Sequence, residues 1–419
     1  MTNRLTPWIV CFAASLFFAY ELMQLHMLNA ISPMLMKDLS LSATDLGYLG
    51  STYVLADVLF LLPAGIILDR YSTRKVILSA LFFCILGTFG FALSKTLTQA
   101  CISHFLSGIG NAFCFLSCMM LVARWFPPRQ QSMVVGFMIT MGMLGAVIAQ
   151  EPFTQLAQYF TWREALQIDA FIGLLIFAVV FIFVKDFPGV LKSPSAVRSE
   201  LPFFSSLTQS LANPQNIYCG LYTGFMNLPL MIISATYANL FLSQVHHIPL
   251  EKASFIASMI AMGTIVGSPL FGILSDWFGE KKPFMFLGAI FSIITFSLIM
   301  FVPYPSYSLF LSLFFILGVV TSAQVLGYPL VTESSPQHLV GTSQGIAAVV
   351  IMGLAFVLNV VAGHLLDFGW GGVMIDGQRM YSYSDFMRSF AIFPIGFVVS
   401  FFLVFYLKEP KGAIQQVKA

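Results

Sequence analysis

Long apolar stretches separated by short polar segments fill almost the whole chain. Twelve of them reach the length of about 20 residues that a helix needs to cross a bilayer. They lie at about 8–33, 45–68, 75–94, 98–124, 131–156, 164–184, 215–242, 252–275, 283–302, 306–331, 341–366 and 388–407. Because lipid offers the backbone no hydrogen-bond partner, each run is predicted to be a helix and not a strand. Charged residues make up only 9% of the chain, against about 25% in a soluble domain. The pattern therefore predicts an all-α membrane protein with 12 transmembrane helices.

One polar pattern occurs in both halves of the chain, each time between two apolar runs. It places an Asp four residues after a Gly and basic residues shortly afterwards. The first copy comprises Gly65, Asp69, Arg70, Arg74 and Lys75, and the second comprises Gly272, Asp276, Lys281 and Lys282. The offset between the two glycines is 207 (272 − 65), and the offset between a second pair of anchors, Pro127 and Pro336, is 209 (336 − 127). Two anchors at about half the chain length predict an internal duplication.

These residues resemble the signature loop of the major facilitator superfamily, which lies on the cytoplasmic side between the second and third helices of each half. The resemblance covers the whole chain and implies two pseudosymmetric six-helix bundles around a central cavity. The bundles would occupy residues 1–185 and 214–419, joined by a Pro- and Ser-rich cytoplasmic linker at 186–213. It also implies that the two loops act as a conformational switch. A simple excess of Lys and Arg in cytoplasmic loops explains the basic residues, but not the repeated Gly-to-Asp spacing.

The basic residues also predict the orientation. With the N-terminus inside, six of the 20 Lys and Arg residues lie outside, which leaves 14 on the cytoplasmic side. The six are Lys37, Lys95, Arg163, Lys252, Arg379 and Arg388. This positive-inside bias predicts a multi-pass protein with both termini in the cytoplasm, and the family resemblance, which is to bacterial-type members, implies a bacterial inner membrane.

Two titratable residues stand out within the apolar runs. Glu21 lies near the middle of the first run, where a carboxylate is costly unless it faces a cavity or a partner. In the fourth run, His104 precedes Gly108 and Gly110 at a position where the family often has Arg, and His, unlike Arg, titrates near neutral pH. We expect Glu21 to be a proton-coupling residue with His104 as its nearest partner. A structural Glu, a neutral structural imidazole and a uniporter in which Glu21 holds a substrate amine remain open, as does a purely structural role for Asp57 as a hydrogen-bonding residue between helices.

The family resemblance implies that helices 1, 4, 7 and 10 line the cavity, and their polar residues are then candidates for substrate binding. They are Gln24, Asn111, Tyr218, Tyr222, Asn227, Thr321, Gln324 and Tyr328. Pro229 should kink the seventh helix. Because no Lys or Arg lies deep in any run, sugar phosphates, nitrate and dicarboxylates are disfavoured. A small neutral or zwitterionic solute, such as an amino acid or a short peptide, fits better.

The resulting hypothesis is a secondary transporter that works by alternating access, most simply as a proton-coupled uptake system. Its expected partners are a small-molecule substrate, protons and lipid, and we expect a monomer without nucleic acid, metal or cofactor. The six cysteines all lie in apolar runs, which disfavours a disulfide framework. Neither an ATP-binding loop nor a catalytic cluster occurs, so an enzyme is not expected. A proton-antiporting exporter of amphipathic metabolites or drugs remains an alternative because the runs are rich in Phe and Met. A non-transporting membrane sensor is a more remote one.

Overall fold

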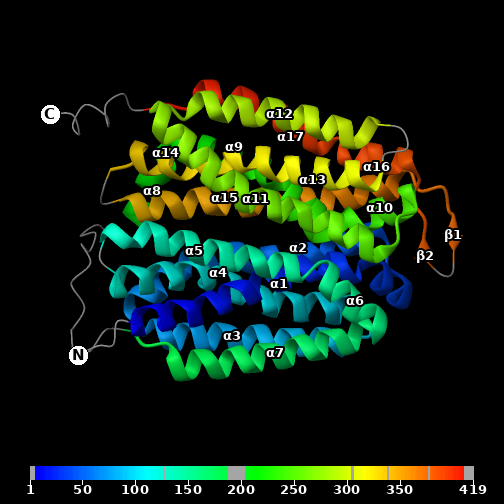
Figure 1. Ribbon diagram of the computed structural model, residues 1–419, viewed down its shortest axis with the longest axis horizontal. Helices are drawn as coiled ribbons and strands as arrows, with labels where there is room; N and C mark the ends of the chain where they lie inside the picture. Colours follow the sequence, from blue (N-terminus) through cyan, green and yellow to red (C-terminus); the bar gives the residue numbers. More distant parts are fainter. Residues whose placement is uncertain are drawn as a thin grey trace. The chain divides into compact units, whose positions relative to one another are not determined.

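The computed structural model describes residues 5–126, 128–186, 203–302, 306–336, 339–375 and 378–409, and nearly all of them are helical (Figure 1). The N-terminal half contains α1 (Thr6–Leu39), α2 (Ala43–Arg70), α3 (Thr73–Ala92), α4 (Leu97–Trp125), α5 (Pro128–Ile148), α6 (Glu151–Tyr159) and α7 (Trp162–Phe183). After these come α8 (Phe203–Ala212), α9 (Pro214–Leu228), the π-helix η1 (Pro229–Tyr237), α10 (Ala238–His246), α11 (Leu250–Phe278) and α12 (Lys282–Phe301). The chain then continues through α13 (Tyr307–Thr321), the 3₁₀-helix η2 (Ser322–Leu326), α14 (Gly327–Ser334), α15 (Val340–Phe368), a hairpin of β1 (Met374–Ile375) and β2 (Gln378–Arg379), α16 (Tyr383–Phe390) and α17 (Ile392–Tyr406).

Contacts divide the chain into two compact units. Unit 1 contains residues 1–193, 234–258 and 359–389, and unit 2 contains 194–233, 259–358 and 390–419. This grouping differs from the predicted division at 185/186 and 213/214. The difference arises because two segments of the second half pack against the N-terminal helices. Residues 187–202, most of the predicted linker, lie outside the described residues.

Local sequence signals determine where the helices of unit 1 begin. Ser42, Ser72, Thr96 and Thr161 precede α2, α3, α4 and α7, and each side chain accepts a hydrogen bond from the backbone N–H three residues later. Such caps satisfy N–H groups that have no partner within the helix. Helices α1, α3 and α7 then run side by side (Figure 1), so that side chains from three helices meet in the interior of the unit.

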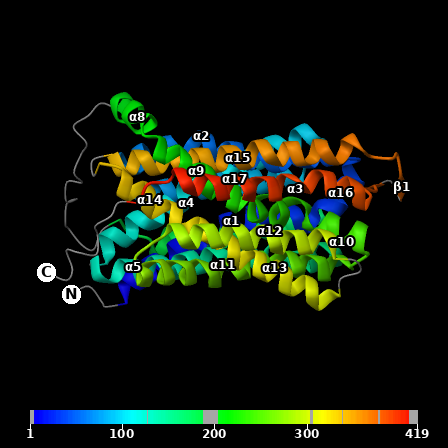
Figure 2. The same cartoon turned by 90° about the horizontal axis from the view of Figure 1, so that it is seen from above.

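In unit 2, α17 lies beside both α9 and α12 (Figure 2). The long helices of this unit repeat the spacing of the first half. Helices α3 and α12 both contain 20 residues, and the offset between their N-caps, Ser72 and Lys281, equals that between Pro127 and Pro336 (281 − 72). Helix α4 ends at Trp125 and α14 ends at Ser334, which is the same offset again (334 − 125). The predicted duplication is therefore present in the fold.

The repeat is irregular in two places, both in the second half. The 34-residue α1 is continuous, whereas its counterpart is interrupted by the π-helix that begins at Pro229. Likewise α4 is one helix, while its counterpart passes through the 3₁₀-helix Ser322–Leu326. Pro lacks an N–H and disrupts regular helical hydrogen bonding, so the predicted irregularity at Pro229 takes the form of a π-helical segment.

Eleven helical segments within the described residues are long and apolar enough to cross a membrane. The predicted fifth run, 131–156, is not among them. It falls on α5 and α6, which are separated at Ala149 and Gln150. Gln150 is buried and its side chain has polar partners, described below, and Pro152 follows it at the start of α6.

A matched pair of glycines tests how closely these helices pack. A Cβ atom at Gly145 of α5 would lie 1.9 Å from the carbonyl oxygen of Ala19 in α1, whereas one at Gly353 of α15 would meet nothing within 4 Å. We expect Gly145→Ala to lower the free energy of unfolding by about 1–3 kcal/mol, because the backbones must separate. Gly353→Ala should change it by less than about 0.5 kcal/mol. Thermal unfolding in detergent measures both, and equal effects would contradict the close packing of α1 and α5.

Candidate functional site

Glu21 of α1 is a fully buried carboxylate in unit 1. The hydroxyl of Tyr53, on α2, donates to Glu21 Oε2 at 3.0 Å and also lies 2.9 Å from the Glu21 carbonyl oxygen. Oε1 has no hydrogen-bond partner among the described residues. It lies against Gly110 of α4, where a Cβ atom would come within 2.1 Å of it. Only a glycine therefore leaves room for this carboxylate between α2 and α4.

His104 of α4 lies close to the same tyrosine. Its ring centroid is 5.0 Å from that of Tyr53 and 5.3 Å from that of Phe91. The ring is buried, and its Nδ1 atom has no hydrogen-bond partner in the described part of the chain. The structure thus brings both His104 and Glu21 against the Tyr53 side chain, and no direct bond between the two is seen.

A second carboxylate lies one helical turn beyond Tyr53. Asp57 is buried, and the side chain of Asn111, on α4, hydrogen-bonds to it. Asn111 also accepts a hydrogen bond from the Cys114 thiol. None of the buried side chains that the structure describes belongs to Lys or Arg. The interior of unit 1 therefore combines several carboxyl groups with amides, hydroxyls and an imidazole.

A polar network joins α1 to the segment 234–258 near the end of the unit where α1 finishes. Asn29 Nδ2 donates to Gln150 Oε1 at 2.8 Å, and Gln150 Nε2 donates to the Ser234 carbonyl at 2.8 Å. Asn239 donates through its backbone N–H to Asn29 Oδ1 at 3.0 Å and through Nδ2 to the Asn29 carbonyl at 2.9 Å. All four residues are buried, so separating them would leave several polar groups without partners.

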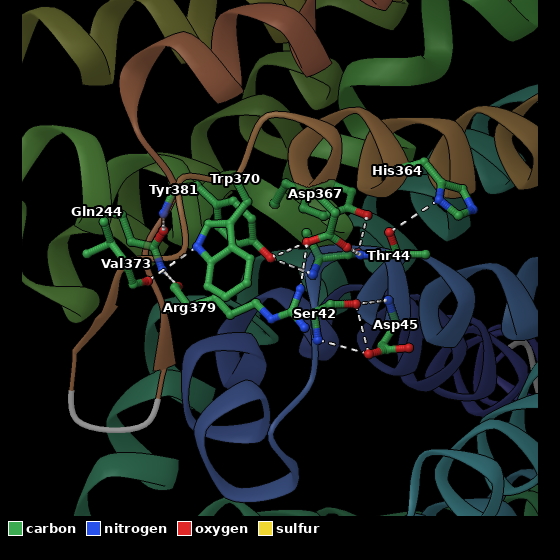
Figure 3. Close-up of polar contacts among 12 residues, drawn as sticks. Ser42, Thr44, Asp45, Gln244, His364, Asp367, Trp370, Val373, Arg379 and Tyr381 are labelled. Atoms are coloured by element: carbon green, nitrogen blue, oxygen red, sulfur yellow. Dashed lines mark hydrogen bonds and ion pairs between the residues drawn. The ribbon is translucent and has the colours of Figure 1, made fainter.

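Asp367, at the end of α15, makes a second connection at this end (Figure 3). Its Oδ2 accepts the backbone N–H of Thr44 at 2.7 Å, and its Oδ1 accepts the hydroxyl of Tyr381 at 2.6 Å. The Tyr381 hydroxyl in turn accepts the N–H of Ala43 at 2.8 Å. Two of the N–H groups that α2 leaves free at its start are thus capped by residues from the other half of the sequence. A negative charge at a helix N-terminus also interacts favourably with the helix dipole.

The segment between α15 and α16 surrounds this cap. The Arg379 guanidinium lies 3.4 Å from Asp367 Oδ1 and over the ring of Trp370, 4.3 Å from its centroid. Gln244 of α10 donates to the Arg379 carbonyl and accepts from the Tyr381 N–H. Burial and the hydrogen bond to Asp367 raise the pKa of Tyr381 well above its usual value, so its hydroxyl keeps the proton that it donates. We call Asp367, Arg379 and Tyr381 the α2 clamp.

The predicted switch loop of the first half lies at the opposite end of unit 1, where α2 finishes. Asp186 follows α7, and its carboxylate accepts the Ser72 hydroxyl at 2.5 Å and the Arg74 backbone N–H at 2.9 Å. Arg124, from the end of α4, donates to Thr73 Oγ1 at 2.8 Å and lies 3.9 Å from Asp186. A carboxylate therefore caps α3, and the end of α4 is tied to the same turn.

Unit 2 repeats this arrangement with different residues. Glu409 follows α17 and accepts the backbone N–H groups of Lys281 at 2.5 Å and of Lys282 at 3.4 Å. The Lys281 ammonium lies 2.7 Å from Glu333, at the end of α14. Glu333 occupies the position in the repeat that corresponds to Arg124 in the first half, so the charge there is reversed. In each half of the sequence, an acid that follows the last helix of that half caps the helix after the switch loop.

The other predicted switch residues do not share these contacts. The side chains of Gly65, Asp69 and Arg70 lie outside the described residues. Lys75 and Asp276 are exposed. A Cβ atom at Gly272 would meet nothing within 4 Å in the described structure.

Two predicted substrate-binding residues face helices of their own unit and are already engaged there. Gln24 is buried between α3 and α7, where it contacts Thr88 and Asp169. The hydroxyl of Tyr222 donates to the Met285 carbonyl of α12 at 3.0 Å. Both side chains thus have polar partners within their own bundle, and their role in substrate binding stays a prediction.

The remaining predicted residues of unit 2 group around the two irregular helices. Asn227 lies close to the end of α9, and the Thr223 hydroxyl, one helical turn before it, donates to the Gln324 carbonyl of η2 at 3.1 Å. Thr321 donates to the Leu317 carbonyl within its own helix. Tyr218 packs its ring against Tyr406, and Tyr328 is 41% exposed. Asn227 and Gln324 thus lie at the places where helical regularity breaks down, which are common positions for functional residues.

Sequence reasoning missed Tyr53, Asp169 and the residues of the α2 clamp. Asp169 carried a usable signal, because it is an acid inside the sixth apolar run. Tyr53 precedes Asp57 by one helical turn, but tyrosine is ordinary in a membrane helix. The clamp joins the start of α2 to residues near the far end of the sequence, and no local pattern marks such a pair.

The model of the Major Facilitator Superfamily matches residues 9–360. The chain belongs to this superfamily. It is accordingly a multi-pass membrane protein and a secondary transporter, not an enzyme. The family match confirms the resemblance inferred from the repeated loop.

Curated relatives of the chain are named for acid sugars. It is 28% identical over 174 residues to the hexuronate transporter of Bacillus subtilis, a match that covers 41% of each chain. It is 23% identical over 365 residues to a protein of Escherichia coli named "Probable galactarate/D-glucarate transporter GarP", covering 79% of this chain and 82% of that one. The chain thus spans less than half of the first relative and most of the second.

Solved structures show the same fold. A bacterial homologue of the human lysosomal transporter Spinster, in an inward-facing and unoccupied conformation, aligns with a TM-score of 0.77 at 15% identity, covering 98% of this chain and 100% of that one. The nucleoside transporter NupG aligns with a TM-score of 0.76 at 15% identity, covering 96% of this chain and 100% of that one. At this identity the likeness concerns the fold alone.

The α2 clamp can be tested by accessibility. Asp367→Asn and Tyr381→Phe each remove a group that caps α2, and a hydrogen bond to a charged group contributes about 1.5–3 kcal/mol. We expect either substitution to raise the labelling rate of a cysteine placed at the buried Ala43, on the order of tenfold. Tyr159→Phe, at a tyrosine that is 84% exposed, serves as the control. Unchanged labelling in both clamp variants would show that the clamp does not hold this end closed.

Proposed function

We propose that the chain is a proton-coupled transporter of a small polar metabolite and that Glu21 is its coupling residue. The observation that carries this proposal is the Glu21 carboxylate itself. It is buried, it has one oxygen without a partner, and no buried cation accompanies it among the described residues. Such a group favours binding a proton, because an ionised carboxylate in an apolar bundle is costly. Tyr53, which contacts both Glu21 and His104, would relay a change in one to the other.

The same observation bears on the substrate. An interior with several carboxyl groups and, among the described residues, without a buried Lys or Arg favours a neutral or zwitterionic solute, such as an amino acid or a short peptide, whose amine a carboxylate can hold. Asn111 in unit 1, and Asn227 and Gln324 in unit 2, are the amides that we propose contact it. Proton symport would then provide uptake against a gradient.

An acid sugar is the second candidate substrate, and the names of the relatives favour it. A sugar acid brings several hydroxyl groups that amides and hydroxyls of the protein can bind, and its carboxylate could be neutralised by the coupled proton. The two candidates predict different solutes but use the same proton site.

The switch loops, topology and assembly belong to the same proposal. We propose that Arg74, Lys281 and Lys282 act in the conformational switch through the caps on α3 and α12, together with Asp69. The protein would lie in a bacterial inner membrane as a monomer. Its two termini would lie in the cytoplasm, an orientation that the distribution of basic residues supports.

Glu21→Gln tests the coupling role. In proteoliposomes, the variant should retain exchange of labelled substrate but lose accumulation driven by a pH gradient, because glutamine preserves the shape of a protonated Glu and cannot release the proton. Glu280→Gln, at an acid outside the buried interior, should behave like the wild type.

Two outcomes would contradict this role. Loss of binding and exchange together would make Glu21 a substrate ligand, and wild-type transport that ignores the pH gradient would exclude proton coupling.

A thermal-shift screen tests the substrate. A ligand that binds only the folded state at 100 times its Kd stabilises it by about 2.7 kcal/mol. We expect stabilisation by one class of solute in a panel of amino acids, short peptides, galactarate, glucarate and hexuronates, and counterflow of that solute in vesicles. Stabilisation by the sugar acids alone would replace the first candidate by the second.

A further inference from the structure

Asp169 of α7 is a second fully buried acid in unit 1, and the coupling role proposed above does not use it. Its Oδ2 atom lies 2.5 Å from the side-chain amide of Gln24, on α1. Its Oδ1 atom has no hydrogen-bond partner among the described residues. The other end of the Gln24 amide lies 2.9 Å from Thr88 Oγ1, on α3. One amide thus connects an acid and a hydroxyl from two different helices.

The hydrogen bonds of this chain of groups can be arranged in two ways. The amide nitrogen and oxygen of glutamine have nearly the same shape, so their positions are decided by the partners. If the nitrogen of Gln24 faces an ionised Asp169, its oxygen must accept from Thr88. The single hydroxyl hydrogen of Thr88 is then required by two acceptors, because the Cys84 carbonyl lies at the same distance of 2.9 Å.

The opposite arrangement leaves no hydrogen claimed twice. A protonated Asp169 donates from Oδ2 to the oxygen of Gln24, the nitrogen of Gln24 donates to Thr88, and Thr88 donates to the Cys84 carbonyl.

The surroundings favour the neutral acid as well. The titratable groups that face Asp169 are Tyr20 and Glu21 from α1 and Cys84 from α3. None of them is a cation, and the Tyr20 hydroxyl is directed to the Asp169 carbonyl oxygen at 3.3 Å, not to the carboxylate. An ionised Asp169 would therefore be a buried charge with one amide as its only donor, which costs more than a neutral acid with one unpaired oxygen.

We propose that Asp169 is a second proton-binding residue, which is protonated in the folded protein and donates its proton to Gln24. It is a positioning residue. Gln24 follows Glu21 by three residues on the same face of α1, so the Asp169–Gln24–Thr88 chain fixes the turn of α1 that carries Glu21. Loss of the proton from Asp169 would turn its hydrogen bond around, and the Gln24 oxygen and the Cys84 carbonyl would then compete for the single Thr88 hydroxyl hydrogen. This assignment holds whether or not Glu21 couples transport to protons.

Infrared spectroscopy of the purified protein tests the assignment directly. A parent carrying Glu21→Gln and Asp57→Asn removes the two other buried acids described above. We expect it to show, at neutral pH, the carbonyl stretch of a protonated carboxylic acid, shifted when aspartate is labelled with ¹³C. Adding Asp169→Asn should abolish the band.

The positioning role has its own measurement. Asn at position 169 can donate to Gln24 as the neutral acid does, so Asp169→Asn should unfold within about 2 °C of the wild type at neutral pH. At alkaline pH the wild type should become less stable, because the ionised carboxylate has no second donor, whereas the variant should not. Asp169→Leu, which cannot donate at all, should be less stable than Asp169→Asn at both pH values.

Absence of the band in the labelled parent at neutral pH would overturn the proposal, and this result does not depend on whether any Asp169 variant folds. A wild type and an Asp169→Asn variant that lose stability equally at alkaline pH would also overturn it. Failure of Glu21→Gln to affect coupling would leave both measurements unchanged.

Discussion

The structure depends on one constraint, which is that a polar group taken into an apolar helical bundle must find its partner within the protein. Unit 1 satisfies it with long-range side-chain bonds. Asn29, Gln150 and Asn239 pair with one another's amides and with backbone carbonyls, and Asp367 takes an N–H group at the start of α2. The few atoms left unpaired among the described residues include Glu21 Oε1 and Asp169 Oδ1, which belong to carboxyl groups. Such groups can resolve the problem by binding a proton.

The same constraint explains why segments from the second half of the chain group with the first. The end of α1 and the start of α2 carry amides and free N–H groups, and their partners lie in residues 234–258 and 359–389. In a transporter such partnerships have to be reversible. Each hydrogen bond contributes only about 1 kcal/mol net when water can replace it, so opening this end to water costs little free energy. Separating the same groups without admitting water costs much more, because they are left buried without partners. The arrangement therefore favours a closed and an open state over intermediates.

The sequence predicted the fold well because its signals are local and repeated. Apolar runs, helix caps such as Ser42 and Ser72, and a repeat at about half the chain length all appear in the structure. The candidate site was harder to predict. The depth of Glu21 followed from its position in the run. Its partner Tyr53 could not be predicted, because the residues that face Glu21 depend on how α2 and α4 are rotated and on how closely α4 approaches α1 at Gly110. Gln24 and Tyr222 were candidates because the family resemblance places their helices at the cavity. Their hydrogen bonds to Asp169 on α7 and to a carbonyl on α12 could not be predicted, because no local pattern marks such partners.

The two capping acids, Asp186 after α7 and Glu409 after α17, have a practical consequence for handling the protein. Glu409 lies beyond α17 and holds the first turn of α12, together with Lys282, which donates to the Leu407 carbonyl. Residues 407–409 are thus part of the folded domain and not a tail. A protease site, affinity tag or fluorescent fusion placed directly after Tyr406 would remove an anchor from a helix that lies far earlier in the sequence. The same holds for a cut made before Asp186, since α3 depends on that residue in the first half.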